Sequence, residues 1–184
     1  MKINGCGWEY SSDAMIKYHN ERWCKCIKDD DELFAMLVLE GMQAGLSWNC
    51  VIKKEEAIRN NFKRLHPEVV LTMTEPEIEN ALNNKDIIRN KLKVNSIFVN
   101  ARKFIEVQKE YGSFYNYIWH FTDGKVIDHR LERLEDMPTT STLSDTISKD
   151  MKKRGFKFVG STIIYSYLQA IGVINDHLIT CQYR

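Results

Sequence analysis

Four side chains that suit a metal ion lie near the two ends of the sequence. Cys6 and His19 are close to the N-terminus, and His177 and Cys181 form an H-x3-C pair close to the C-terminus. A spacing of four residues places His177 and Cys181 on one face of a helical turn, where they can bind the same ion. Two thiolates and two imidazoles suit a closed, tetrahedral zinc site. Such a site would tie the two ends of the chain together.

The thiols of Cys24 and Cys26 offer an alternative, because they could complete a local site with Cys6 and His19 instead. A third interpretation is that these are ordinary buried thiols and histidines, since the ligand pairs are distant in the sequence. The spacing alone leaves the three interpretations open. Five cysteines is an odd number, which excludes a fully paired disulfide framework within one chain. Reduced thiols in an intracellular protein are the better interpretation.

Glu40 is the strongest candidate for an acid placed in the wall of a pocket. It directly follows an apolar run over residues 34–39, where desolvation would favour its neutral form. The aromatic residues Trp8, Tyr18, Trp23 and Trp48 also lie within the first fifty positions. Aromatic faces around one carboxylate would form a receptor for a flat, cationic ligand that donates hydrogen bonds. A solvent-facing glutamate and aromatic core packing are the alternative.

The net charge of +1 argues against a strongly cationic protein that binds polyanions. The net charge of the whole chain does not reveal two locally basic segments. Residues 85–103 hold six Lys or Arg against one Asp, and residues 149–157 hold five against one Asp. Two such segments on one face could follow a phosphate backbone, although solvated helix faces would look the same. Residues 87–94 also resemble a tight hairpin that leads into a helix, whose free N–H groups suit a phosphate.

Several function classes are poorly supported. The chain has no G-x-S-x-G nucleophile motif, no phosphate loop and no G-x-G-x-x-G motif. It has no run of ~20 apolar residues that could cross a membrane and no hydrophobic signal segment at the N-terminus. We therefore expect a cytoplasmic protein with no membrane partner. A length of 184 residues predicts a single domain, 1–184.

The elements that must position these residues are helices. The spacing of apolar residues predicts a helix from Gly45 towards Arg64 and further helices over residues 31–43, 74–82, 93–110, 113–121, 143–154 and 161–172. Residues 126–131 could form a short strand, but nothing nearby is an obvious partner. The predicted fold class is all-α.

Several longer blocks resemble, in order, the Tag family of 3-methyladenine DNA glycosylases, in the helix-hairpin-helix superfamily. The blocks are CGW (6–8), LEGMQAGLSW (39–48), IIRN (87–90), NAR (100–102), KKRGFKFVG (152–160) and NDH (175–177). The resemblance covers nearly the whole chain and implies an all-helical, two-lobed fold with a base pocket between the lobes. A terminal zinc-binding lobe would comprise about residues 1–30 and 140–184, and a helix-hairpin-helix lobe about residues 31–139.

The resemblance also implies roles for individual residues. One structural zinc ion per chain would be held by Cys6, His19, His177 and Cys181, against the Cys24–Cys26 alternative. Glu40 matches the glutamate that recognises the extruded base. The surrounding pocket residues would be Trp48, Tyr18, Trp8 and Trp23. The residues expected to touch DNA are Gly45 and Leu46, in a loop that probes the gap in the duplex, and Arg89, Lys91 and Lys93 in the phosphate-binding hairpin.

The implied activity is the removal of 3-methyladenine from alkylated double-stranded DNA by a monomeric enzyme. The base would be flipped out and the N-glycosidic bond hydrolysed, leaving an abasic site. No lysine is evident as a pocket nucleophile, so we expect no strand-cleaving lyase reaction. A non-catalytic, zinc-stapled module that binds damaged DNA is the alternative.

Two positions depart from the pattern of this family. Met15 stands where a second tyrosine is common, and Cys24-Lys25-Cys26 replaces the usual Gly-Val-Pro. The first departure affects stacking in the pocket. The second affects the rigidity of the chain after Trp23.

Overall fold

The computed structural model describes residues 5–184 and is mostly helical, with 62% of residues in helices and 2% in strands. The all-α prediction is thus confirmed at the level of composition. The longer helices are α1 (Asp13–Glu21), α2 (Asp30–Gln43), α6 (Glu75–Asn83), α7 (Lys91–Tyr111), α9 (Thr142–Arg154) and α10 (Ser161–Ala170). The shorter helices are α3 (Trp48–Ile52), α4 (Glu55–Asn61), α5 (Pro67–Val70) and α8 (Phe114–Trp119). Four 3-10 turns complete the helical elements: η1 (Trp8–Ser11), η2 (Lys63–Leu65), η3 (His120–Thr122) and η4 (Leu134–Asp136).

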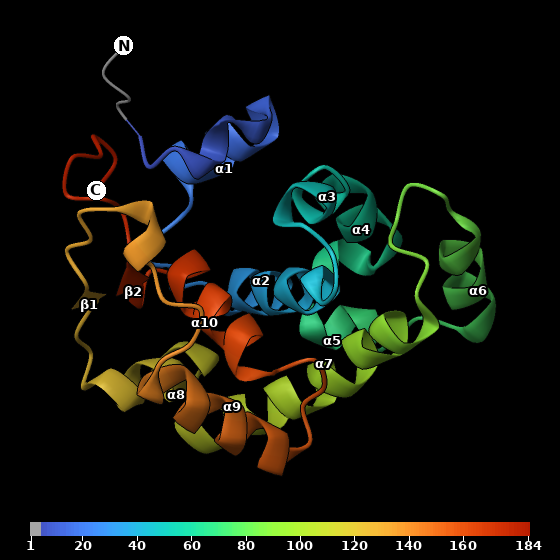
Figure 1. Ribbon diagram of the computed structural model, residues 1–184. Coiled ribbons are helices and arrows are strands. Elements are labelled where there is room, and N and C mark those ends of the chain that lie inside the picture. The colour runs from blue at the N-terminus through green and yellow to red at the C-terminus, as the bar shows by residue number, and fades with distance from the viewer. Residues whose placement is uncertain (1–4) are drawn as a thin grey trace.

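Helix α2 is the central element, and the other helices surround it (Figure 1). The Asp29 side chain caps its first turn by accepting a hydrogen bond from the Glu32 N–H, and acidic residues there complement the helix dipole. Every residue from Leu33 to Met42 is buried. A helix that is buried on all sides must be covered all round, and α2 contacts α3, α7, α8, η2 and α10.

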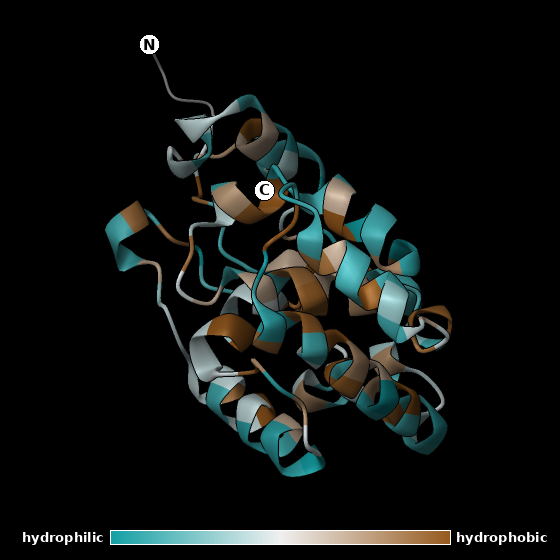
Figure 2. Cartoon of the chain, turned by 90° about the vertical axis from the view of Figure 1, so that its right-hand side faces the viewer, coloured by the Kyte–Doolittle hydropathy of each residue, from teal (hydrophilic) through white to brown (hydrophobic). Residues whose placement is uncertain are grey.

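The outer helices carry one apolar face each. In Figure 2 hydrophilic and hydrophobic residues interleave along them, as expected for amphipathic helices at a surface. The longest, α7, has 21 residues and ends at Gly112, whose φ of 81° places it in the left-handed region that favours glycine. Within the described residues, no helix is long and apolar enough to cross a membrane.

The helix predicted from Gly45 towards Arg64 is instead two helices, α3 and α4. The chain turns at Lys53 and Lys54, where backbone bonds from Lys53 N–H to Asn49 O and from Lys54 N–H to Val51 O close the end of α3. Neither lysine is a helix-breaking residue, so the apolar spacing gave no signal of this turn.

The short strand predicted at residues 126–131 exists and has a partner. Strand β1 (Ile127–Asp128) pairs in parallel with β2 (Ile174–Asn175), with Ile127 opposite Ile174. The partner lies 47 residues away along the chain, beyond the reach of any local pattern. This pairing brings the end of the chain alongside the loop that follows α8.

Candidate active site and metal cluster

A cavity of about 240 Å³ opens beside the C-terminal end of α2. This volume is below the ~300–1,000 Å³ typical of sites for drug-sized ligands, so the cavity suits a single flat ring system. The residues that line it are Trp8, Met15, Tyr18, Trp23, Glu40, Gln43, Trp48, Leu134, Met137, Ser166 and Gln169. They come from η1, α1, α2, α3, η4, α10 and the segments beside them. All five residues predicted for the pocket are therefore brought together.

Glu40 is buried in the wall of this cavity, with 2% of its surface exposed. Its Oε2 atom has no hydrogen-bond partner among the described residues, and none of the residues lining the cavity is basic. Burial raises the pKa of Glu40 to about 8, because the charged form loses its hydration and no cation compensates. A positively charged ligand would supply that missing compensation.

Aromatic rings form most of the remaining wall. The Tyr18 and Trp48 ring centres are 5.2 Å apart at an interplanar angle of 58°, and Trp8 lies against Trp23 at 4.9 Å in an edge-to-face arrangement. The indole Nε1 atoms of Trp8 and Trp48 are buried and have no acceptor among residues 5–184. Buried polar atoms without partners are rare in folded proteins. Together with the Glu40 carboxylate they provide unpaired donors and an unpaired acceptor around one apolar cavity.

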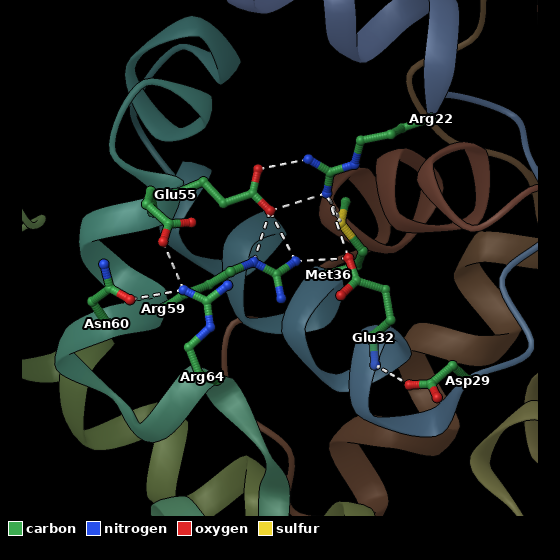
Figure 3. Close-up of polar contacts among 9 residues, drawn as sticks. Arg22, Asp29, Glu32, Met36, Glu55, Arg59, Asn60 and Arg64 are labelled. Atoms are coloured by element: carbon green, nitrogen blue, oxygen red, sulfur yellow. Dashed lines mark hydrogen bonds and ion pairs between the residues drawn. The ribbon is translucent and has the colours of Figure 1, made fainter.

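A network of ion pairs links Arg22, Glu55, Arg59 and Glu32 (Figure 3), and its Arg22 contacts Tyr18. The Arg22 guanidinium lies 5.5 Å from the centre of the Tyr18 ring and donates to Glu55 at 2.7 and 3.0 Å. Arg59 joins Glu55 to Glu32, at 2.8 and 2.7 Å. These contacts fasten α1, which carries Tyr18, to α4 and to the start of α2.

The four predicted metal ligands lie together in the structure. Cys6, His19, His177 and Cys181 are all buried, and their ligand atoms lie within 4.8 Å of one another. The sulfur of Cys181 is 3.4 Å from His177 Nδ1 and 3.7 Å from His19 Nε2, and the sulfur of Cys6 is 3.5 Å from His177 Nδ1. Tetrahedral zinc with bonds of ~2.0–2.3 Å would separate its ligand atoms by ~3.3–3.8 Å. These three separations match those of a four-coordinate site, so the cluster could hold a metal ion.

The surroundings of the two histidines also suit a metal. His19 Nδ1 lies 2.7 Å from the Asn20 side-chain oxygen, and His177 Nε2 lies 3.3 Å from the Trp23 carbonyl oxygen. Each contact holds the N–H on the outer ring nitrogen and leaves the inner nitrogen free to bind a metal. Burial, with a smaller contribution from His19, lowers the pKa of His177 to about 4, so this imidazole is in the neutral form that metals require.

Cys24 and Cys26 are not members of the cluster. Cys24 is partly buried, and burial raises the pKa of its thiol to about 12. The side chain of Cys26 is exposed. Trp23, by contrast, connects the two sites, because it lines the cavity and packs against both His19 and His177, with ring centres 5.7 and 4.6 Å away.

The predicted DNA-contacting residues fall into two groups. Gly45 adopts a φ of +73° directly after α2, a conformation that favours glycine. The next residue, Leu46, is exposed over 42% of its surface. Arg89 and Lys91 are exposed at the start of α7. Lys93 differs from this expectation, because it is buried, with 6% exposed.

The second basic segment, 149–157, also contains one residue that is not free at the surface. Lys149, Lys152, Lys153 and Lys157 are exposed. Arg154 instead donates to Glu110 at 2.6 Å and to Asp150 at 2.7 Å. Its charge is therefore compensated by two neighbouring carboxylates.

Met15, which was expected in the pocket as a departure from the family, also lines the cavity. Sequence reasoning missed five lining residues, namely Gln43, Leu134, Met137, Ser166 and Gln169. A signal existed for two of them. Ser166 and Gln169 are polar residues three positions apart in the mostly apolar second half of α10, which places both on one face. Leu134 and Met137 lie in a segment without periodicity, and no local pattern points to them.

Comparison with known proteins agrees with this geometry. A family model described as methyladenine glycosylase matches residues 8–184. The chain is 39% identical over 176 residues to the DNA-3-methyladenine glycosylase 1 of Escherichia coli, covering 96% of this chain and 94% of that protein. It is 36% identical over 176 residues to the DNA-3-methyladenine glycosylase of Haemophilus influenzae, covering 96% and 95%. The solved structure of 3-methyladenine DNA glycosylase I from Staphylococcus aureus, described as showing the basis of 3-methyladenine recognition, is 32% identical and superimposes with a TM-score of 0.93 over 98% of this chain and 96% of that chain. From its sequence, its fold and its cavity, this chain belongs to the methyladenine glycosylase family.

Proposed function

We propose that this protein releases 3-methyladenine from alkylated double-stranded DNA by hydrolysing the N-glycosidic bond, and so acts in base excision repair. One observation carries the proposal: an unpaired, buried carboxyl group, Glu40, lies in the wall of a cavity that suits a single ring system and has no basic lining residue. The relatives named above as 3-methyladenine glycosylases support the choice of substrate.

The cavity can select an alkylated base by charge. An adenine methylated at N3 is cationic in DNA, and ionised Glu40 would accept charge-assisted hydrogen bonds from its edge. Tyr18 and Trp48 would lie against the electron-poor ring. A normal, neutral base offers no positive charge, so it would leave the cost of ionising Glu40 uncompensated.

The reaction itself needs little acid catalysis, because a cationic base is already a good leaving group. Flipping the nucleotide out of the helix costs a few kcal/mol, least where pairing is already weakened. Water would then attack C1′ of the sugar as the C1′–N9 bond breaks, which leaves free 3-methyladenine and an abasic site. None of the residues lining the cavity is a lysine, so we propose hydrolysis without a covalent imine and without strand cleavage.

We further propose that the cluster of two cysteines and two histidines holds one structural zinc ion. Four protein ligands leave no open position for water or substrate, so the bound metal would supply folding energy rather than chemistry. The cluster joins Cys6 at one end of the chain to Cys181 at the other. Trp23 packs against His177 and also lines the cavity, so a bound metal would help to hold this wall of the cavity in place.

The arrangement of lobes is also a proposal. A terminal lobe of about residues 1–30 and 140–184 would be closed by the metal, although residues 1–4 lie outside the described part of the chain. Residues 31–139 would form the helix-hairpin-helix lobe, with residues 87–94, at the turn into α7, as the hairpin. Leu46 would enter the gap left by the flipped base. A monomer that works in the cytoplasm remains our prediction.

The deciding experiment measures free base released from methylated duplex DNA. Purified protein should release 3-methyladenine, identified by chromatography, and leave abasic sites without strand breaks. The alternative, a module that binds damaged DNA without catalysis, predicts tight binding of the same duplex and no released base. Binding with no release at any protein concentration would therefore overturn the proposed function.

A further inference from the structure

Lys93 is a buried lysine that no carboxylate accompanies. Its Nζ atom donates to the backbone carbonyl oxygens of Met42 and Ala44, at 2.8 and 2.6 Å. Among the described residues, no carboxylate forms an ion pair with it. Taking an ammonium group out of water is costly unless hydrogen bonds replace its hydration. The two carbonyl oxygens replace part of the hydration of the Lys93 ammonium group. The same two hydrogen bonds restrict the position of the backbone at Met42 and Ala44.

The two carbonyl groups belong to the C-terminal end of α2. The last carbonyl groups of a helix have no amide partner within the helix, and a cation there complements the negative end of the helix dipole. Met42 lies two residues after Glu40, and Ala44 directly precedes Gly45 and Leu46. The lysine thus fixes the backbone between the buried carboxylate and the exposed leucine.

Lys93 itself belongs to the first turn of α7. Its own N–H is capped by the side chain of Asn90 at 3.1 Å, and exposed Arg89 and Lys91 flank the same helix start. One side chain therefore connects the basic start of α7 to the end of α2, 49 to 51 residues earlier in the chain.

We propose that Lys93 is a positioning residue that couples the duplex-binding start of α7 to the loop of Gly45 and Leu46, and does not itself contact phosphate. The proposal rests on the proposed function, in which α7 binds the DNA backbone and Leu46 enters the duplex. Binding of a phosphate at α7 would then fix the distance between that phosphate and Leu46.

Replacing Lys93 by methionine, Lys93→Met, tests the coupling because methionine keeps an unbranched side chain and removes the charge and the donors. A misplacement of about 1 Å can lower a rate ~100-fold, so we expect kcat for base release from duplex DNA to fall about 10- to 100-fold. Duplex affinity and its dependence on salt should stay within about twofold of wild type, because no phosphate contact is lost. Binding of free 3-methyladenine should also stay within about twofold, since the cavity does not include Lys93.

Lys91→Met is the matched comparison, two residues away on the exposed surface. Loss of a phosphate contact should lower duplex affinity and reduce the slope of log affinity against log salt by about one. If Lys93→Met shows this lower affinity and smaller slope, or leaves kcat unchanged, the positioning role is overturned.

Labelling of the wild-type protein tests the proposal even if Lys93→Met does not fold. An amine-acylating reagent with detection by mass spectrometry should modify exposed Lys91 in the free protein and less in the DNA complex. Lys93 should be protected in both states. Ready labelling of Lys93 in the free protein, followed by protection on DNA, would overturn the proposal. This measurement needs no catalysis. If the proposed function is wrong, the wild-type protein releases no base; if the coupling is wrong, Lys93 is labelled in the free protein. The two failures are therefore distinguishable.

Discussion

Replacing Glu40 by glutamine should stabilise the folded protein increasingly as the pH rises, and under the proposed function the same change should greatly reduce base release. Burial raises the pKa of Glu40 from 4.5 to about 8, so the folded state resists ionisation. Because its pKa is raised in the folded state, Glu40 does not lower the free energy of unfolding below about pH 4.5. It lowers this free energy progressively as the pH rises towards 8. At pH 7 the loss spans about 2.5 pH units at ~1.4 kcal/mol each, or about 3 kcal/mol. Glutamine, which does not ionise, avoids this loss.

The difference between pH values is the informative quantity. A buried amide that lacks partners costs about 1–3 kcal/mol, but this cost is the same at every pH and cancels in the comparison. Urea denaturation of both proteins at pH 4, 5.5, 7 and 8.5 should therefore show a stability difference that shifts by about 3 kcal/mol in favour of Glu40→Gln between pH 4 and 7. For a chain of this size that corresponds to a shift of about 6–12 °C in melting temperature.

Glu79→Gln is the matched control, because the Glu79 side chain is exposed on α6 and stays hydrated in the folded state. Its stability relative to wild type should not change between pH 4 and 7. The free energies of unfolding of Glu40→Gln and wild type are compared as functions of pH. If their difference stays constant between pH 4 and 7, Glu40 is not desolvated in the folded state, whatever the absolute stabilities are.

The same ionisation should appear in catalysis. With a pKa of about 8, only about a tenth of Glu40 is charged at pH 7 in the free protein. For a substrate that requires the charged form, kcat/KM should rise about tenfold between pH 7 and 9. The corresponding increase in kcat should occur at a lower pH than the increase in kcat/KM, because a bound cationic base lowers the pKa of the Glu40 carboxyl group. A pH-independent kcat/KM for wild type would contradict the assigned role of charged Glu40.

Three other changes test the remaining parts of the site. Cys181→Ser should lower bound metal, measured by elemental analysis, and reduce stability by about 2 kcal/mol or more; a full metal content with unchanged melting would remove Cys181 from the ligand set. Leu46→Gly should lower base release from duplex about tenfold or more, because a leucine buried in the stack contributes ~1.5–3 kcal/mol, and leave binding of free 3-methyladenine unchanged; equal losses in both assays would argue against insertion. Glu55→Gln should weaken binding of the free base several-fold, because Arg22 then supports Tyr18 less firmly; unchanged binding in a titration would show that the network is only structural.

The fold was predictable where one helix buries one face. Residues 93–110 and 143–154 carry apolar side chains at spacings of three and four, and α7 and α9 occupy those positions with an extra residue or two at their ends. Helix α1 was not predicted, although Ser12 caps it through a bond to the Met15 N–H. Its nine residues include three buried ones, Met15, Tyr18 and His19. Such a short apolar face gives a weak periodic signal.

The site was predictable to the extent that residue type determines chemistry. Cysteine and histidine are common metal ligands, so the cluster at the two chain ends could be proposed as one alternative from residue type and spacing before the resemblance selected it. Lysine and arginine have no such single role. Lys93 and Arg154 lie in the two basic segments, yet one bonds to carbonyl oxygens and the other to neighbouring carboxylates. Whether a basic side chain faces solvent depends on contacts from distant parts of the chain, which local charge counts do not contain.

The end of α2 explains how an uncompensated carboxyl group can be kept in place. Glu40 could lower its energy by turning into solvent, but every residue from Leu33 to Met42 is buried, and exposing even two large apolar side chains would cost about 3–6 kcal/mol. This cost equals or exceeds the penalty of about 3 kcal/mol at pH 7 for keeping Glu40 desolvated. Rotation of the helix would therefore gain nothing, and Glu40 stays buried and largely protonated. Under the proposed function, a cationic base in the cavity would favour the charged form and a neutral base would not, so the packing of α2 would contribute to discrimination between alkylated and normal adenine.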